Sequence, residues 1–181
     1  MNKLIINFIA FQLGWFSCVL GAANGYPLVG PAAMLAVVAL HLSMSTNPRN
    51  ELMLLLAAAA MGAVFDSTLT MTGWLVYPNG VLLAGTAPYW IVAMWVLFAT
   101  TLNVSLRWMH NRPIAAFLLG AVGGPLSYLA GARLGGLEFI DKPAALIYLA
   151  VGWGLVTPLL VVLAHRLDNK IPADRVVPQH A

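Results

Sequence analysis

One carboxylic acid, Asp66, lies inside a long apolar segment and is the first candidate for chemistry. A charged side chain at the centre of a spanning helix costs about 2.5–3.5 kcal/mol on insertion scales, so it needs a partner, water or a proton. Small residues accompany it on one side of the predicted helix, which places that side against protein. Arg133 is predicted at a similar depth in a later apolar segment, and we expect the two to form an ion pair. Such a pair either clamps two helices together or serves ligand binding or proton handling.

More polar residues follow Arg133 in the next connecting segment. Glu138 and Asp141 are the acids there, so three carboxylates would lie near one mouth of the protein if Asp66 is included. Carboxylates beside a membrane cavity can bind a cation or act as general acid and base. An ordinary solvated loop would contain the same residues, and the sequence leaves both interpretations open.

A separate polar layer is predicted toward the other side of the membrane. Asn103 and Arg107 stand one helical turn apart, and His41 reaches a similar depth on another helix. His41 has no second histidine or acid at ligand spacing on its own helix, so no metal site is expected. Gln12, near mid-membrane, is expected to hydrogen bond between helices.

Familiar catalytic motifs are missing from the sequence. Ser127 follows a Gly-Gly-Pro-Leu segment that lacks the spacing of a nucleophile elbow, and it has no base adjacent in sequence. There is also no phosphate loop, no paired-histidine zinc helix and no dinucleotide fingerprint. We therefore expect neither a metal nor a cofactor.

Six long apolar stretches must position these residues. The chain has 181 residues, of which 61% are hydrophobic and 8% charged, and its mean hydropathy is +0.85. That composition provides too little polar surface for a water-soluble globule, and runs of roughly 20 apolar residues suit membrane-spanning helices. The predicted fold class is an all-α polytopic membrane bundle with about six transmembrane helices, at residues 4–23, 27–44, 51–72, 88–108, 114–134 and 143–165.

The basic residues predict the orientation, because cytoplasmic loops carry the excess of Lys and Arg. With the N-terminus inside, seven basic residues are cytoplasmic and two face outward. The first group comprises Lys3, Arg49, Arg107, Arg112, Arg166, Lys170 and Arg175, and the second Arg133 and Lys142. We expect a six-helix domain over residues 1–167 and a polar cytoplasmic tail over 168–181, with both termini inside. The basic pI of about 9.3 then reflects topology, not nucleic-acid binding.

Glycines predict close helix packing in the fifth apolar stretch. Gly120, Gly124, Gly131 and Gly135 follow one another at spacings of four, seven and four, which places them on one helical face. The uncharged loop over residues 73–87 is apolar but interrupted by Pro78-Asn79-Gly80 and by Gly85. It either lies in the membrane interface or re-enters the bilayer.

Three stretches resemble a known family: residues 11–16 (FQLGWF), 99–108 (ATTLNVSLRW) and 123–135 (GGPLSYLAGARLG). They are similar to the domain-of-unknown-function 2878 family of small bacterial inner-membrane proteins. The resemblance runs from the first helix through the last and leaves out the tail. It implies a multi-pass location in the inner membrane and a single domain. Members of that family are often encoded near cyclopropane-fatty-acid-synthase-like methyltransferases and flavin-dependent oxidoreductases in photo-oxidative stress clusters, which implies a lipid-related accessory role.

Three functions remain open on this basis. The leading hypothesis is an accessory to membrane lipid or fatty-acid modification under oxidative stress. An acyl chain would lie in a cleft between the third, fourth and fifth helices, with Asp66, Asn103, Arg107 and Arg133 as polar anchors. Its partners would be membrane lipid and either lipid-modifying enzymes or further copies of the chain. The alternatives are a small-molecule transporter or substrate-capture subunit, and an intramembrane enzyme that uses Asp66 or Glu138 as acid or base.

Overall fold

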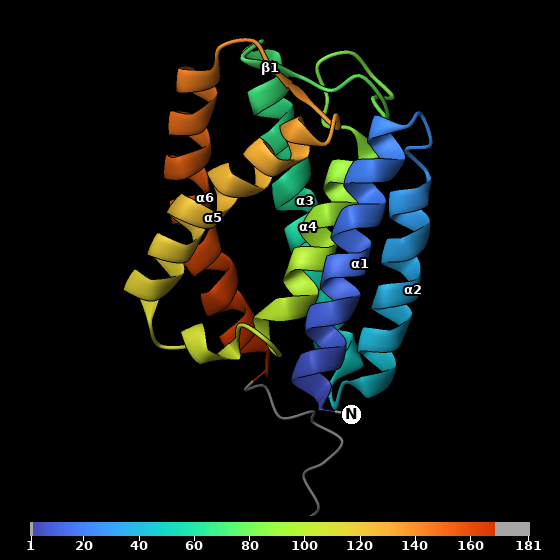
Figure 1. The fold of residues 1–181 in the computed structure, drawn as a ribbon. Helices are drawn as coiled ribbons and strands as arrows, with labels where there is room; N and C mark the ends of the chain where they lie inside the picture. The colour runs from blue at the N-terminus through green and yellow to red at the C-terminus, as the bar shows by residue number, and fades with distance from the viewer. Residues whose placement is uncertain (1, 169–181) are drawn as a thin grey trace, which may run out of the picture.

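The computed structural model describes residues 2–168, which form six α-helices, one short 3-10 helix and a two-stranded antiparallel sheet (Figure 1). The predicted tail lies outside the described residues except for Asp168, which ends the last helix. The helices are α1 (Lys3–Ala23), α2 (Val29–Met44), α3 (Pro48–Met71), α4 (Tyr89–Leu102), α5 (Pro113–Arg133) and α6 (Lys142–Asp168). The shorter elements are η1 (Arg107–Met109), β1 (Leu75–Val76) and β2 (Glu138–Phe139), and the two strands pair with each other.

Four of these helices, α1, α3, α5 and α6, are long and apolar enough to cross a membrane. The other two are apolar but shorter, with 16 residues in α2 and 14 in α4. At 1.5 Å per residue they measure about 24 Å and about 21 Å, less than the roughly 30 Å of a bilayer core. The all-helical prediction is confirmed, and the length and composition of four helices suit a multi-pass membrane protein.

The surface of the bundle is apolar and much of its polar chemistry is inside. Leucines on three different helices are more than half exposed, namely Leu13, Leu35 and Leu56, whereas Asp66 and Thr157 are fully buried. A water-soluble protein shows the opposite distribution, because unpaired polar groups favour water and large apolar patches avoid it. The outer surface of this protein is therefore suited to hydrocarbon.

Helix α4 is shorter than the sequence predicts, because it ends at Leu102 instead of near residue 108. Thr100 and Thr101 each direct the side-chain hydroxyl to the carbonyl three residues earlier, which competes with regular helix geometry. The backbone N–H groups of Val104 and Leu106 then both bond to the carbonyl of Thr101, which closes a turn. Asn103 and Arg107 consequently lie on a turn beyond the helix.

The helices form two groups that meet along α3 and α4. Helices α1 and α2 pack on each other and on α4, while α5 packs on α6 and α6 packs on α3. Figure 1 shows α5 running obliquely across α6. The start of α1, the α2–α3 turn and the α4–α5 connection share one end of the bundle, here called the basic end because Lys3, Arg49, Arg107 and Arg112 lie there.

The segment over residues 73–87 folds over the opposite end of the bundle. Its strand β1 pairs with β2, and Asn79 Nδ2 donates to the carbonyl of Ala22 over 2.9 Å. Tyr77 is buried, whereas Leu82 and Leu83 remain 77% and 70% exposed. This arrangement favours the interfacial interpretation of the loop, with a tyrosine directed into the core.

A buried carboxyl group, an apolar cleft and a polar cavity

Asp66 lies in the core of the bundle, fully buried and held by three hydrogen-bond donors. Its Oδ1 accepts from the hydroxyls of Tyr77 and Tyr128 over 2.9 and 2.6 Å, and its Oδ2 accepts from Trp95 Nε1 over 2.7 Å. The donors come from the 73–87 loop, α5 and α4, so this one side chain joins three parts of the fold to α3. Burial, aided by the neighbouring Asp66, holds the pKa of the Tyr77 phenol well above its usual range, so its hydroxyl stays a donor.

The predicted Asp66–Arg133 ion pair is wrong. Both carboxyl oxygens already accept hydrogen bonds from Tyr and Trp side chains, and Arg133 is exposed at the end of α5. The physical reason is helical geometry: Arg133 follows Tyr128 by five residues, which turns it about 140° around the helix and about 7.5 Å along it. Because Tyr128 points inward, Arg133 points away from the core.

A cleft of about 350 Å³ runs between two walls, one formed by α1 and α4 and the other by α5 and α6. On α1 its lining extends from Phe8 to Val19, which corresponds to about 16 Å along the helix axis. Its surface is mostly aromatic and aliphatic. The indole rings of Trp95 and Trp153 stack within it, with their centroids 4.2 Å apart and an interplanar angle of 16°. An elongated apolar molecule matches this shape and lining.

Asp66 stands behind the wall of this cleft and does not line it. Two of its donors, Trp95 and Tyr128, are lining residues, so the carboxyl group fixes the position of both. The cleft also contains Thr157, which is fully buried and whose Oγ1 has no hydrogen-bond partner among the described residues. A hydroxyl in that situation is a candidate partner for a polar atom of a bound molecule.

Glycines of α5 set the spacing between α5 and α6. A Cβ at Gly120 would lie 2.1 Å from the carbonyl oxygen of Trp153, and one at Gly124 would lie 2.4 Å from its ring, so both positions require glycine. A Cβ at Gly123 would meet nothing within 4 Å, although this residue also lines the cleft. Gly131 is buried, as predicted for a packing residue, but Gly135 lies beyond the helix with φ of +87° and is exposed. The predicted face of four glycines therefore contains three.

A second cavity, of about 310 Å³, opens at the basic end and is here called the basic-end cavity. It brings together the three residues of the predicted polar layer, His41, Asn103 and Arg107. Glu51 joins them: its Oε1 accepts from Asn103 Nδ2 over 2.8 Å, and its Oε2 lies 3.0 Å from His41 Nε2. Asn103 and Arg107 therefore line this cavity and not the apolar cleft. The prediction that these two residues anchor an acyl chain in the cleft is wrong.

The buried and exposed groups of the basic-end cavity differ in charge. His41, Glu51 and Asn103 are each at most 9% exposed. Lys3 and Arg107 are exposed, and Arg107 forms an ion pair with Asp168. The bottom of the cavity thus carries carboxylate and amide groups, whereas its rim carries mostly basic side chains.

The sequence matches a family model described as a protein of unknown function, DUF2878, over residues 4–159. The chain belongs to this family. No curated protein and no solved structure matches the chain. The match includes all residues of both cavities except Lys3 and Asp168, so both sites are built from the part of the chain that defines the family.

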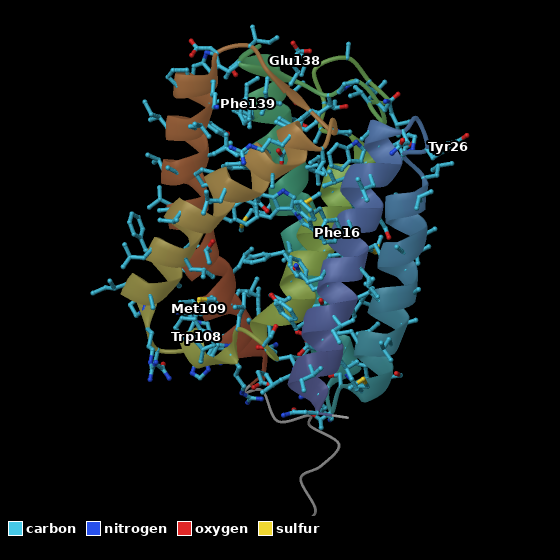
Figure 2. The ribbon with its side chains drawn as sticks, viewed as in Figure 1. Phe16, Tyr26, Trp108, Met109, Glu138 and Phe139 are labelled. Carbon is cyan, nitrogen blue, oxygen red and sulfur yellow. The ribbon has the colours of Figure 1, made fainter. Side chains whose placement is uncertain are left out.

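Three further residues that the sequence predicts to be functional lie apart from both cavities. Glu138 and Asp141 are exposed at the end opposite Trp108 and Met109, as Figure 2 shows for Glu138, and Asp141 Oδ1 accepts from the backbone N–H of Ala144 at the start of α6. The predicted group of three carboxylates is therefore wrong, because Asp66 is enclosed in the core. Gln12 is half-buried and makes no hydrogen bond to any other described residue, so its predicted interhelical bond is absent.

Ser127 lines the apolar cleft, where its half-buried hydroxyl adds a polar group to the wall. It makes no hydrogen bond within the described residues, so no general base approaches it there.

Two groups of residues that the structure brings together are not indicated by the sequence pattern. Tyr77, Trp95 and Tyr128 were overlooked as donors because aromatic side chains in apolar segments also occur as simple packing residues. Glu51 is not singled out by the sequence, because it begins the apolar stretch over residues 51–72. A signal existed, since Glu51 precedes Asp66 by 15 residues, which places both within about 60° on the same helical face.

Proposed function

We propose that this DUF2878 protein is an integral membrane protein that binds an elongated apolar molecule of the acyl-chain class in the cleft between α1, α4, α5 and α6. The observation that carries the proposal is the lining, which is aromatic and aliphatic along about 16 Å and includes the fully buried Thr157 hydroxyl, which has no hydrogen-bond partner among the described residues. An acyl chain with a terminal carboxyl or ester group presents the matching chemistry. In the cell, this activity would make the protein an accessory to lipid or fatty-acid modification.

In this proposal Asp66 is a positioning residue. It is fully buried and is not part of the cleft surface, but it holds Trp95 and Tyr128, which are. A carboxyl group fixed by three donors is better suited to maintaining a rigid wall than to direct exchange with a ligand. Asp66 therefore supports the cleft wall through Trp95 and Tyr128 and does not form an ion pair with Arg133.

We also propose that all six helices span the bacterial inner membrane and that the basic end faces the cytoplasm, as the distribution of Lys and Arg favours. The test uses single cysteines in a Cys18→Ala background, since Cys18 is the only cysteine of the chain. Glu138→Cys and Arg112→Cys are exposed positions at opposite ends of the bundle. A membrane-impermeant thiol reagent added to spheroplasts should label the first and not the second, and the reverse pattern would overturn the orientation.

The binding test uses tryptophan fluorescence, because four tryptophans line the cleft: Trp15, Trp90, Trp95 and Trp153. A brominated fatty acid quenches indole fluorescence on contact. Titration of the protein in mild detergent should therefore give saturable quenching at a stoichiometry of one. A non-brominated fatty acid should reverse the quenching by competition.

Gly123→Leu is the matching variant, because Gly123 lines the cleft and a Cβ there would meet nothing within 4 Å, so a larger side chain can begin there without a clash. Replacing a helical glycine also favours the helix by about 0.5–1 kcal/mol, so the variant should fold. Val122→Leu is the control, because Val122 is the adjacent, 57% exposed residue and does not line the cleft. Saturable quenching should disappear in Gly123→Leu and persist in Val122→Leu. Equal quenching in both variants would mean that the fatty acid only partitions into detergent, and the proposed function would be wrong.

A further inference from the structure

We propose that the basic-end cavity is a second binding site, independent of the apolar cleft, and that it binds a small zwitterion. The ammonium group of the ligand would lie at the base beside Glu51 and Asn103, and its anionic group would lie at the rim beside Lys3 and Arg107. Phosphoethanolamine has this chemistry, either as a free molecule or as the headgroup of a phospholipid.

The base of the cavity has more acceptors than donors. The Glu51 carboxylate receives one bond from Asn103 Nδ2 and a contact of 3.0 Å from His41 Nε2, which leaves lone pairs on both oxygens. Asn103 is only 8% exposed, and its Oδ1 has no hydrogen-bond partner among the described residues. A buried acceptor without a partner is uncommon, and an ammonium group offers three N–H donors to satisfy such atoms.

The rim has the opposite charge. Lys3 Nζ donates one hydrogen bond to the carbonyl of Met44 over 3.1 Å, and two of its three N–H groups remain available. Arg107 is paired with Asp168 through one nitrogen, and the guanidinium has further donors. Both side chains are exposed at the mouth, so an anion arriving from solvent meets them first.

The order of charges along the cavity selects the ligand class. A simple cation would have to pass Lys3 and Arg107, and a simple anion would meet the Glu51 carboxylate at the base. A molecule with an anionic and an ammonium end satisfies both layers at once, which is electrostatic complementarity of the kind that gives specificity. The volume of about 310 Å³ is within the range of small-molecule sites.

Glu51→Gln is the test variant because it removes the charge and keeps the shape. Its side-chain amide can still accept from Asn103 and donate to His41, so the local network is retained. Glu138→Gln is the matched control, since Glu138 is an exposed carboxylate on β2 at the opposite end of the bundle. Circular dichroism and size-exclusion chromatography establish that both variants are folded.

The first arm measures binding of phosphoethanolamine, inorganic phosphate and ethanolamine to purified protein by calorimetry. Phosphoethanolamine should bind at least about tenfold more tightly than either half-molecule, and Glu51→Gln should weaken it by about tenfold or more, the factor for a hydrogen bond to a charged group. Glu138→Gln should bind like the wild type. Equal affinity for inorganic phosphate would define a plain anion site, equal affinity for ethanolamine a plain cation site, and either would overturn the proposal.

The second arm distinguishes the two sources of the ligand. Thermal unfolding is measured in nanodiscs containing either phosphatidylethanolamine or phosphatidylcholine, whose trimethylated ammonium has no N–H to donate. If the source is the lipid headgroup, phosphatidylethanolamine should raise the wild-type Tm relative to phosphatidylcholine, and this difference should vanish in Glu51→Gln. The proposal is wrong if neither the free zwitterion nor the phosphatidylethanolamine nanodisc acts through Glu51. Because the Gly123→Leu experiment concerns a different cavity, failure of one proposal leaves the other intact.

Discussion

The hydrogen bond between Tyr128 and Asp66 provides the sharpest test of the core network. The Tyr128 hydroxyl donates to Asp66 Oδ1 over 2.6 Å, and the two residues are 5% and 0% exposed. Tyr128→Phe removes this donor, together with the contacts of the same hydroxyl with Tyr77 and Trp153, and keeps the ring. Since a hydrogen bond to a charged group contributes about 1.5–3 kcal/mol, the variant should lower the free energy of unfolding by that amount.

The same substitution should have a different effect when the acceptor is absent. In Asp66→Ala, the Tyr128 hydroxyl has lost its carboxylate acceptor and keeps only its contacts with Tyr77 and Trp153, so replacing it with hydrogen should cost much less than in the wild type. A double-mutant cycle on residues 66 and 128 should therefore give a coupling energy of about 1.5–3 kcal/mol, near the upper part of the range for residues in contact. Reversible unfolding in mixed micelles with increasing denaturing detergent measures all four variants.

Two controls separate this network from the ion pair that the sequence predicts. Tyr26→Phe removes a hydroxyl from a residue that is 70% exposed, and its effect should be small and additive with Asp66→Ala. Arg133→Gln should also change stability by no more than about 0.5 kcal/mol, because Arg133 is exposed. Additivity of Tyr128→Phe with Asp66→Ala within about 0.5 kcal/mol would refute the network. A large coupling between Arg133 and Asp66 would restore the ion pair.

Two further predictions concern packing and pH. Gly120→Ala should destabilise the protein by about 1–3 kcal/mol or more, because its Cβ would lie 2.1 Å from the Trp153 carbonyl oxygen. Gly123→Ala should instead stabilise the protein by about 0.5–1 kcal/mol, because its Cβ would meet nothing within 4 Å. Similar Tm shifts for both variants would contradict the described α5–α6 contact. Burial lowers the pKa of His110 from its usual 6.5, and so does His165, whose Nδ1 lies 3.1 Å from Nδ1 of His110. The unfolded chain then takes up a proton more readily than the folded chain, so stability should fall as the pH drops through about 6.5, and His110→Asn should reduce that fall. Unfolding of both proteins at about pH 8 and about pH 5.5 is the measurement, and an equal fall in both would exclude this contribution.

Helix boundaries were predictable where they depend on local chemistry. The first helix was expected at residues 4–23 and occurs at Lys3–Ala23, and the fifth was expected at 114–134 and occurs at Pro113–Arg133. Proline at the start of α5 and a turn after its end are local signals. The end of α4 was not predictable in this way, because no glycine or proline occurs in residues 103–112. The chain turns there only because the Thr101 carbonyl accepts the N–H groups of Val104 and Leu106.

The burial of Asp66 was easier to predict than its hydrogen-bond partners. A lone acid in an apolar helix must be enclosed, so the interior position of Asp66 follows from the cost of exposing a charge to hydrocarbon. Its partners depend on how far each helix is rotated about its axis. A rotation that brings Tyr128 inward turns Arg133 outward, and neither hydropathy nor charge specifies which of the two occurs.

The sequence by itself therefore determined the class of protein, the approximate helices and the residues that must avoid lipid, because these follow from the free energy of transferring each segment between water and hydrocarbon. Only the tertiary structure decided that Asp66 supports an aromatic wall, and that Glu51 meets His41 and Asn103 at the basic end. These contacts join residues 10 to 62 positions apart in the chain. They depend on helix rotation, tilt and close approach at small residues such as Gly120, which are set by the packing of the whole bundle and not by any one segment.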